Sequence, residues 1–453
     1  MPERSLPPGP PGRWLLGNLL DVGPGQDQLG FLTRSARQYG DLVQLRFGRR
    51  LVLLAAHPDL VEQVLQAQHR NFAKGYFYRI LSPLVGDGLL TSEGDFWLRQ
   101  RRLAQPAFHR ARIAAYAETM LAYADEIMAD WRVGTPRDIY EDMTRLTLSV
   151  VGKTLFDADL AHEAAPVGAA LGTALRELNG QISGLELLLP GWVPTPSRRR
   201  LQAAVRRLDG MVYRLIAERR ASGQDRGDLL SALLHAQDED GSRMTDRQLR
   251  DEAMTIVLAG HETTAIALSW TWLLLAQHPD IEARVREEVQ RVVGDRPPQV
   301  DDVPRLTLLD AVLREAMRLY PPIVGIGRES TTEVELGGYR LPPGTNVFIN
   351  LWLIQRDPRF FDRPDAFDPD RWLDGRTRDL PRFAYFPFGG GPRLCIGQSF
   401  AMMEATLVLA RIISQWRLEL LPGRSVSMAA ALTLRPIGGP VMVPQRVGVP
   451  ASL

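Results

Sequence analysis

A glycine-rich segment that leads into the only cysteine limits the folds open to this chain more than any other stretch. It reads Phe-Pro-Phe-Gly-Gly-Gly-Pro-Arg-Leu-Cys-Ile-Gly-Gln-Ser-Phe from Phe386 to Phe400. Three glycines and a proline leave little side-chain cover before Cys395, and a helix is expected to start directly after it. Backbone N–H groups at a helix start favour a thiolate over a thiol. Gly397 leaves room beside the sulfur for a flat ligand.

The spacing around Cys395 separates several possible roles. A lone cysteine is most often an inert core residue. A phosphatase loop requires an arginine six residues after the cysteine, where this chain has Ala401. No Lys-Ser/Thr pair follows the glycines, which excludes a nucleotide-binding loop, and nothing nearby matches the local sequence of a papain-like nucleophile. A thiolate that binds a metal or a haem remains open.

The composition excludes several classes of protein. One cysteine in 453 residues allows neither an intrachain disulfide nor a cysteine-rich zinc site, which suits a reducing interior. The net charge of +1 argues against a nucleic-acid partner, because neutralising phosphates requires an excess of Lys and Arg. The most apolar segment, 265–276, is shorter than the ~20 residues of a membrane span. We therefore predict a cytoplasmic protein with no membrane anchor.

The order of patterns predicts a mainly α protein with a minor β portion. Residues 1–12 form a proline-rich lead-in. Helical patterns dominate from about Pro58 to Tyr320, and the longest, about Thr245 to His278, is closed by Pro279. Short strands are expected over 42–56, 331–347 and 417–447, and a final helix over 400–416. No fixed repeat or long linker divides the chain, so we predict one domain over 1–453 with small sheets at its periphery.

The middle of the longest predicted helix carries a polar cluster, Ala-Gly-His-Glu-Thr-Thr, from Ala259 to Thr264. A zinc protease would require the pattern H-E-x-x-H, with a second histidine three residues after the glutamate. Ala265 occupies that position, so a zinc protease is excluded. Polar residues in mid-helix can also simply bond to the preceding turn, and from spacing alone that alternative stays open.

The spacing Phe388-x-x-Gly391-x-Arg393-x-Cys395-x-Gly397 resembles the haem-binding signature of the cytochrome P450 superfamily of haem-thiolate monooxygenases. It matches that signature at every fixed position. The resemblance implies a P450-like fold with the long central helix over the haem. It also implies haem b, iron protoporphyrin IX, as cofactor and Cys395 as the iron ligand. Phe388, Gly391, Arg393 and Gly397 are then expected to contact the cofactor.

The cluster from Ala259 to Thr264 resembles the oxygen-activating pattern of the same family: a small residue, Gly, any residue, an acid and Thr. Ala259 is expected to lie against the cofactor, and Gly260 would let a ligand approach the helix. The resemblance assigns a proton relay during oxygen activation to Glu262 and Thr263.

Two more segments follow the family's order. Glu315-Ala-Met-Arg318 places a carboxylate and a guanidinium on one helical face. An isolated pair of this kind is usually a solvated surface pair. In the family a second arginine, here Arg371, binds the same carboxylate, and the apolar neighbours favour a buried bidentate network. The network would have a structural role, holding the loop that presents Cys395.

The segment Trp97-Leu-Arg-Gln-Arg101 resembles the family's W-x-x-x-R, whose Trp and Arg bind a haem propionate. Arg393 and Arg328 are expected to contribute, because guanidinium groups suit carboxylates. The surroundings are strongly basic through Arg99, Arg102, Arg110 and Arg112. Such a cluster is either a solvated face or a docking surface for an acidic electron carrier.

A thiolate ligand favours splitting of the O–O bond. The resemblance therefore implies insertion of one atom of O2 into a small apolar substrate, such as a fatty acid, a terpenoid or a carotenoid-like compound. By analogy the pocket is expected from the mostly aliphatic segments 77–90, 175–189, 259 with 263, 323–326 and 432–434. No flavin or iron–sulfur domain fits in the remaining sequence. We therefore expect a separate ferredoxin or flavodoxin-type donor with its reductase.

Two alternatives share the cysteine ligand. One is a haem-thiolate peroxygenase or isomerase that uses a peroxide in place of O2. The other is a non-catalytic haem sensor, in which Glu262 and Thr263 would have no task. The intact acid–alcohol pair favours the monooxygenase.

Overall fold

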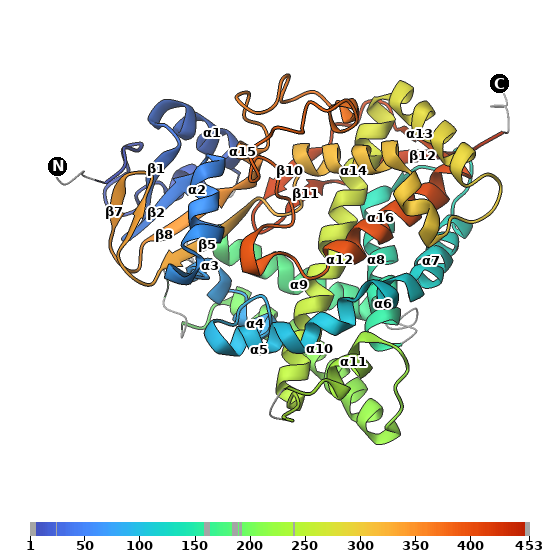
Figure 1. The fold of residues 1–453 in the computed structure, drawn as a ribbon, viewed down its shortest axis with the longest axis horizontal. Helices are drawn as coiled ribbons and strands as arrows, with labels where there is room; N and C mark the ends of the chain where they lie inside the picture. Colours follow the sequence, from blue (N-terminus) through green and yellow to red (C-terminus); the bar gives the residue numbers. More distant parts are fainter. Residues whose placement is uncertain are drawn as a thin grey trace.

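The computed structural model describes residues 6–23, 25–157, 164–183, 189, 193–238 and 241–448, arranged as in Figure 1. The helices are α1 (Gln28–Tyr39), α2 (Pro58–Glu62), α3 (Tyr76–Arg79), α4 (Ser82–Val85), α5 (Gly94–Ala104), α6 (Arg110–Ala115), α7 (Ala117–Ala129), α8 (Ile139–Phe156), α9 (Ala164–Ser183), α10 (Pro196–Ser222), α11 (Leu229–His235), α12 (Asp246–Gln277), α13 (Pro279–Val292), α14 (Thr307–Leu319), α15 (Leu351–Ile354) and α16 (Gln398–Ile413). The strands are β1 (Leu42–Phe47), β2 (Arg50–Ala55), β3 (Phe72–Ala73), β4 (Arg137–Asp138), β5 (Gly325–Ser330), β6 (Val334–Leu336), β7 (Tyr339–Leu341), β8 (Asn346–Asn350), β9 (Trp416–Leu420), β10 (Ser427–Ala430), β11 (Leu434–Ile437) and β12 (Val441–Arg446).

Helix α12 crosses the middle of the molecule (Figure 1) and begins and ends where its sequence predicts. At its start the Thr245 hydroxyl accepts the N–H of Gln248 at 3.3 Å, and the Gln248 side chain accepts the N–H of Thr245 at 2.8 Å. This capping box satisfies two backbone donors at the helix start. Pro279 begins α13, because a proline fits the first turn of a new helix but not the interior of the old one.

Packing on several sides fixes the position of α12. It contacts α8, α10, α14 and α16, and most of its residues are buried. One apolar cluster joins Leu268 of α12 to Leu146 of α8 and Leu409 of α16. A second joins Leu258 to α8, α9 and α10. Burying one such side chain contributes about 1.5–3 kcal/mol, so the middle of α12 is held rigidly.

The largest sheet lies at the N-terminal end of the molecule (Figure 1), in the order β1-β2-β8-β5-β3. β2 and β8 pair in parallel, with Leu53 opposite Val347, and the other pairs are antiparallel. Three smaller sheets complete the β portion. The β10–β11 hairpin adjoins the segment just before β5 through a bridge between Thr433 and Ile323. The predicted mainly α class with small sheets is confirmed.

In the described part of the chain, none of the helices is both long and apolar enough to cross a membrane.

Candidate active site

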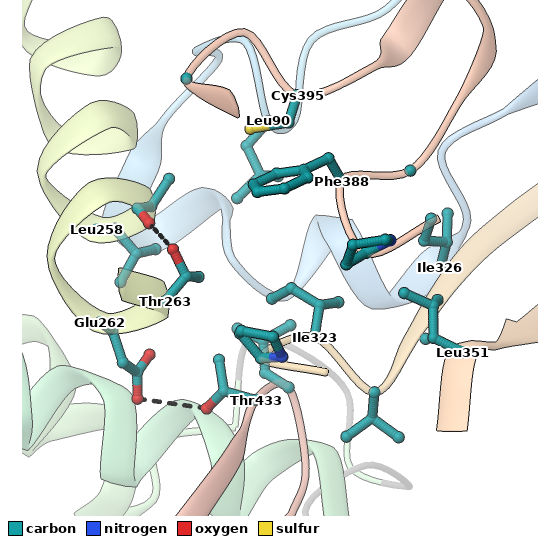
Figure 2. A pocket seen from close by; sticks show the side chains of 18 of the residues that line it. Leu90, Leu258, Glu262, Thr263, Ile323, Ile326, Leu351, Phe388, Cys395 and Thr433 are labelled. Atoms are coloured by element: carbon teal, nitrogen blue, oxygen red, sulfur yellow. Dashed lines mark hydrogen bonds between the residues drawn. The ribbon is translucent and has the colours of Figure 1, made fainter. Parts of the chain in front are cut away.

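A cavity of about 510 Å³ lies between α12 and the loop that carries Cys395 (Figure 2). Residues 322–328 and the tip of the β10–β11 hairpin close it on other sides. Its walls are mostly aliphatic and aromatic, as shown by Leu90, Leu258, Ile323, Ile326, Leu351 and Phe388. Such a cavity suits an apolar organic molecule.

Cys395 stands between a tight turn, Gly391–Arg393, and the start of α16, and its thiol opens into the cavity (Figure 2). The backbone N–H groups of Gly397 and Gln398 donate to the sulfur, as predicted for a helix start. Burial nevertheless raises the pKa of the thiol, although these two donors and the charge of Arg101 oppose the rise. A bound metal ion would complete the deprotonation.

Gly391 and Gly397 serve different purposes. Gly391 has a φ of +66°, and a Cβ there would lie 1.9 Å from the carbonyl oxygen of Leu65, so the turn admits only glycine. Gly391 is not among the described residues that line the cavity, whereas its neighbours Gly389 and Gly390 are, and its contact with the cofactor stays a prediction. Gly397 does line the cavity, and a Cβ there would meet Phe108 at 3.9 Å. The predicted room beside the sulfur is present.

The wall opposite Cys395 is the face of α12 that carries Ala259 and Thr263. The Thr263 hydroxyl donates to the carbonyl oxygen of Ala259 at 2.5 Å, which leaves its oxygen free to accept. Gly260 borders the cavity as well, but a Cβ there would lie 3.2 Å from Val151 of α8. Its missing side chain therefore permits close packing of the two helices, and the approach of a ligand at Gly260 stays a prediction.

Glu262 and Thr263 are neighbours with different partners. The Glu262 carboxylate is 3% exposed and accepts from the hydroxyl of Thr433 at 3.3 Å (Figure 2). Nε of Arg435 lies 3.8 Å from the same oxygen. Burial raises the pKa of Glu262, while Arg435 and Thr433 act to lower it.

A group of cationic side chains borders the cavity beside Cys395. The cavity lining includes Arg101, Arg328 and Arg393 together with Trp97, and their binding of a propionate stays a prediction. The guanidinium carbon of Arg393 lies 4.1 Å from the ring centroid of Trp97, and Arg393 also pairs with Glu93. Arg101 donates to the carbonyl oxygen of Leu394 at 2.8 Å, which ties α5 to the cysteine loop.

Lys74 joins this cationic group, although the motif analysis did not identify it. Its amine donates to the carbonyl oxygens of Leu89 at 2.6 Å and Ser92 at 3.0 Å. Burial and the nearby charges of Arg393 and Arg328 lower the pKa of Lys74 to about 6, against the effect of two glutamates. An anionic group bound beside Lys74, Arg328 and Arg393 would offset this effect and favour the charged form of the amine.

The residues present fit a haem. The sulfur of Cys395 faces the cavity, Ala259 and Gly397 leave its two walls open, and the cationic group supplies partners for carboxylates. Cys395 would hold the iron, and Trp97, Arg101, Arg328, Arg393 and Lys74 would bind the propionates.

The Glu315 network is buried as predicted. Arg318 donates to both oxygens of Glu315 at 2.8 Å, and Nε of Arg371 donates at 3.0 Å. The indole N–H of Trp372 and the N–H of Asp368 donate to the same carboxylate at 2.9 and 3.0 Å. The side chains of Glu315 and Arg318 have no exposed surface.

Gln355 connects this network to the cysteine loop. The remaining nitrogen of Arg318 donates to the carbonyl oxygen of Gln355 at 2.9 Å. The Gln355 side chain donates to the carbonyl oxygen of Met317 and accepts the N–H of Phe386, at 3.0 and 3.1 Å. Phe386 begins the segment that leads to Cys395, so this contact supports the predicted holding role.

Four of the five predicted pocket segments contribute to the cavity. The lining includes Leu90, Thr263, Ile323 and Leu432 from those four. The segment 175–189 differs. Its residues 184–188 lie outside the described part of the chain, as does the side chain of Phe77 in the segment 77–90. The described residues of 175–189 are absent from the lining. Leu175 and Leu178 instead pack in the core. Unpredicted lining comes from Leu19, Val22 and Leu29 near the N-terminus.

The basic region around α5 and α6 is partly neutralised. Arg99 and Arg102 both pair with Asp238, and Arg112 lies 3.8 Å from Asp225. Arg110 is exposed. The other three arginines have acidic partners, so a variant of Arg110 best distinguishes a solvated face from a docking surface.

Comparison with known proteins agrees with this geometry. The family model described as Cytochrome P450 matches residues 7–440. Cyclooctatin synthase of Streptomyces melanosporofaciens is 43% identical, covering 90% of this chain and 89% of that protein. Pentalenene oxygenase of Streptomyces avermitilis is 40% identical, covering 88% and 89%. The crystal structure of the cytochrome P450DA heme domain superposes with a TM-score of 0.88 at 30% identity, covering 98% of both chains.

The fold and the cavity are those of a haem-dependent oxidoreductase. The chain belongs to the cytochrome P450 family, and it is a monooxygenase that uses haem, O2, a redox partner and an apolar substrate. The predicted P450-like fold is confirmed.

Sequence reasoning missed the partners of Glu262. Thr433 and Arg435 lie more than 170 residues away on a separate hairpin, and no local pattern marks a threonine or arginine on a strand as a partner of a helix. Lys74 carries one signal in the sequence, because it is one of only two lysines in the chain.

Proposed function

We propose that this monooxygenase hydroxylates a terpenoid. Haem b would be held by Cys395, and electrons would come from a separate ferredoxin or flavodoxin-type donor with its reductase. One observation carries the proposal: a thiol and the Thr263 hydroxyl border a single cavity whose other walls are apolar. Two relatives named for cyclooctatin and pentalenene act on terpenoids, which favours this class over fatty acids.

When bound, haem with a thiolate ligand supplies the chemistry that splits O2. The residues of the chain arrange its surroundings. Ile323, Ile326 and Leu90 orient the substrate and exclude water. We assign proton handling to α12, where the Thr263 hydroxyl accepts a hydrogen bond from water in the cavity and Glu262 holds a proton at the wall.

A binding screen tests the substrate class. Cyclic terpene hydrocarbons and linear fatty acids of similar size are added to the holoenzyme, and the change in the haem spectrum reports which ones displace water. Terpenes are expected to bind more tightly and, with a reductase and ferredoxin, to gain one oxygen from isotopically labelled O2. Exclusive binding of fatty acids, or turnover with peroxide and none with O2 and an electron donor, would contradict the proposal. Ile326→Phe should weaken terpene binding by narrowing the cavity.

A further inference from the structure

The segment 86–93, which connects α4 to α5, packs against the N-terminal part of α12 and supplies part of the cavity wall. Its side chains Leu89 and Leu90 line the cavity, and Leu90 is drawn there in Figure 2. The segment consists of turns and contains neither helix nor strand. Its position therefore depends on the side chains that hold its main chain.

Two acidic residues of α12 hold backbone N–H groups of this segment. The Asp251 carboxylate accepts the N–H of Asp87 at 3.0 Å, and the Glu252 carboxylate accepts the N–H of Leu89 at 3.1 Å. The contact is close, because a Cβ at Gly88 would lie 2.6 Å from the carbonyl oxygen of Asp251. The segment is therefore seated directly on the helix.

The two acids differ in their other partners. Asp251 also bonds to Arg250 at 2.9 Å, and Arg250 in turn pairs with Asp209 of α10. Glu252 is 1% exposed, and its second oxygen has no hydrogen-bond partner among the described residues. A buried acid with so few bonds costs free energy, and such groups persist where they have a task. The bond of Glu252 to the N–H of Leu89 indicates what that task is.

Lys74 holds the same segment from the other side. Its amine donates to the carbonyl oxygens of Leu89 and Ser92, and its third donor remains for the propionate assigned to it. The main chain of Leu89 is thus held at both ends, the N–H by Glu252 and the carbonyl oxygen by Lys74. The two charges also act on each other: burial raises the pKa of Glu252 to about 7, and Lys74 acts to lower it.

We propose that Glu252 and Lys74 are positioning residues that clamp the main chain of Leu89 and thereby set where the wall of Leu89 and Leu90 meets the substrate. The inference rests on the proposed function, because it takes an apolar terpenoid to lie against that wall. Such a substrate offers few polar groups to bind, so the position of the wall decides its orientation. A displacement of about 1 Å can slow a reaction by roughly 10²-fold.

Hydrogen exchange of the holoenzyme tests the clamp. Exchange at single amides is compared between the wild type and Glu252→Leu, which removes the acceptor and keeps a side chain of similar size. Exchange at Leu89 should accelerate by roughly 10- to 100-fold, the change expected for losing a hydrogen bond to a charged group. Glu252→Gln keeps an oxygen at the same reach and should show a smaller increase. Lys74→Met should also accelerate exchange at Leu89, because it frees the carbonyl end.

Glu288→Leu is the matched control. Glu288 of α13 is also a buried carboxylate that accepts backbone N–H groups, those of Leu308 and Leu309 at 2.9 and 3.0 Å, and none of the three lines the cavity. This variant should accelerate exchange at Leu308 and Leu309 and leave Leu89 unchanged. Glu252→Gln and Glu288→Gln repeat the comparison if a leucine variant does not fold. Equal acceleration at Leu89 in both variants would overturn the proposal, because it would reflect a general loosening of the fold.

Product analysis gives a second readout that a purely structural role would not move. With a terpene that the wild type converts, Glu252→Gln should raise KM more than it lowers kcat and should change the ratio of hydroxylation products. Its reduced, CO-bound spectrum should stay that of the wild type, and Glu288→Gln should keep the wild-type KM and product ratio.

The outcomes separate the clamp from the proposed function. Unchanged exchange at Leu89 in Glu252→Leu overturns the clamp. Faster exchange with an unchanged product ratio and KM overturns the positioning role. If the wild type converts no terpene, the proposed function fails, whereas the exchange comparison still decides whether Glu252 and Lys74 clamp the segment.

Discussion

The Glu315 network and the middle of α12 are both polar and buried, but they differ in how completely their groups are bonded. Both oxygens of Glu315 and every nitrogen of Arg318 have partners, and in Arg371 one nitrogen, Nη2, has no hydrogen-bond partner in the described part of the chain. In α12, by contrast, both ring nitrogens of His261 and the hydroxyls of Thr255 and Thr264 have no hydrogen-bond partner among the described residues.

This difference separates a structural region from a functional one. The nearly complete bonding of Glu315 and Arg318 stabilises one conformation, because the loss of a partner would leave a buried charge with neither a counter-charge nor water. Unpartnered polar groups cost free energy and persist where a ligand, water or proton has to bind. Glu262, held by one long hydrogen bond and one ion pair, belongs to the second kind.

Breaking the bonded region should have the largest effect. Glu315→Gln leaves the guanidinium groups of Arg318 and Arg371 buried without a counter-charge, so the free energy of unfolding should fall by about 3–5 kcal/mol. Urea unfolding followed by circular dichroism measures this. Asp310→Asn on the same helix removes an exposed pair with Arg314 and should change stability by less than about 0.5 kcal/mol. Equal losses would remove the distinction between the two regions.

Thr263→Ala should affect turnover and leave stability nearly unchanged. Without the hydroxyl at the cavity wall, product formation should fall by roughly 10²-fold while electrons are diverted to hydrogen peroxide. The ratio of product to peroxide measures this. Thr271→Ala removes the same kind of bond, from a hydroxyl to the carbonyl four residues earlier, in the core and should not change the ratio. A fully coupled Thr263→Ala enzyme would refute the assignment.

His261 should make the protein sensitive to acid. Burial lowers its pKa to about 4, below the value near 6.5 of the unfolded chain. Between these values only the unfolded chain binds the proton, so stability is complete above pH 6.5 and falls as the pH drops toward 4. At pH 5 the loss should be about 2 kcal/mol, and His261→Leu should remove it. His109→Leu, at an exposed position, should keep the acid dependence. Identical pH profiles for wild type and His261→Leu would contradict this account.

Surface charge should have the smallest effect. Reversing Arg110 to Glu on α6 should slow electron transfer from a ferredoxin by about two- to fivefold at low salt, and added salt should erase the difference. Stopped-flow reduction of the haem measures the rate. Arg340→Glu on β7, at the far end of the molecule in Figure 1, should have no effect. An equal loss from both variants would show that no particular face is used.

Local patterns predicted the elements well because their causes are local. Thr245 caps α12 and Pro279 ends its pattern, so both boundaries follow from neighbouring residues. The positions of Glu315, Arg318 and Arg371 were also predictable, since the first two share one helical face.

Features that depend on distant packing were not predictable. The need for glycine at position 391 comes from Leu65, and at position 260 from Val151, neither of which is close in sequence. The pairing of Arg99 and Arg102 with Asp238 depends on how a distant loop folds back onto α5.

The most direct test of the account is the spectrum of the reduced, CO-bound protein. If Cys395 supplies a thiolate to the haem iron, the wild type should show the strongly red-shifted band typical of thiolate ligation. Cys395→Ser, which keeps the size of the side chain but not the sulfur, should lose that band while the fold persists by circular dichroism. A red-shifted band that survives in Cys395→Ser would show that another residue holds the iron.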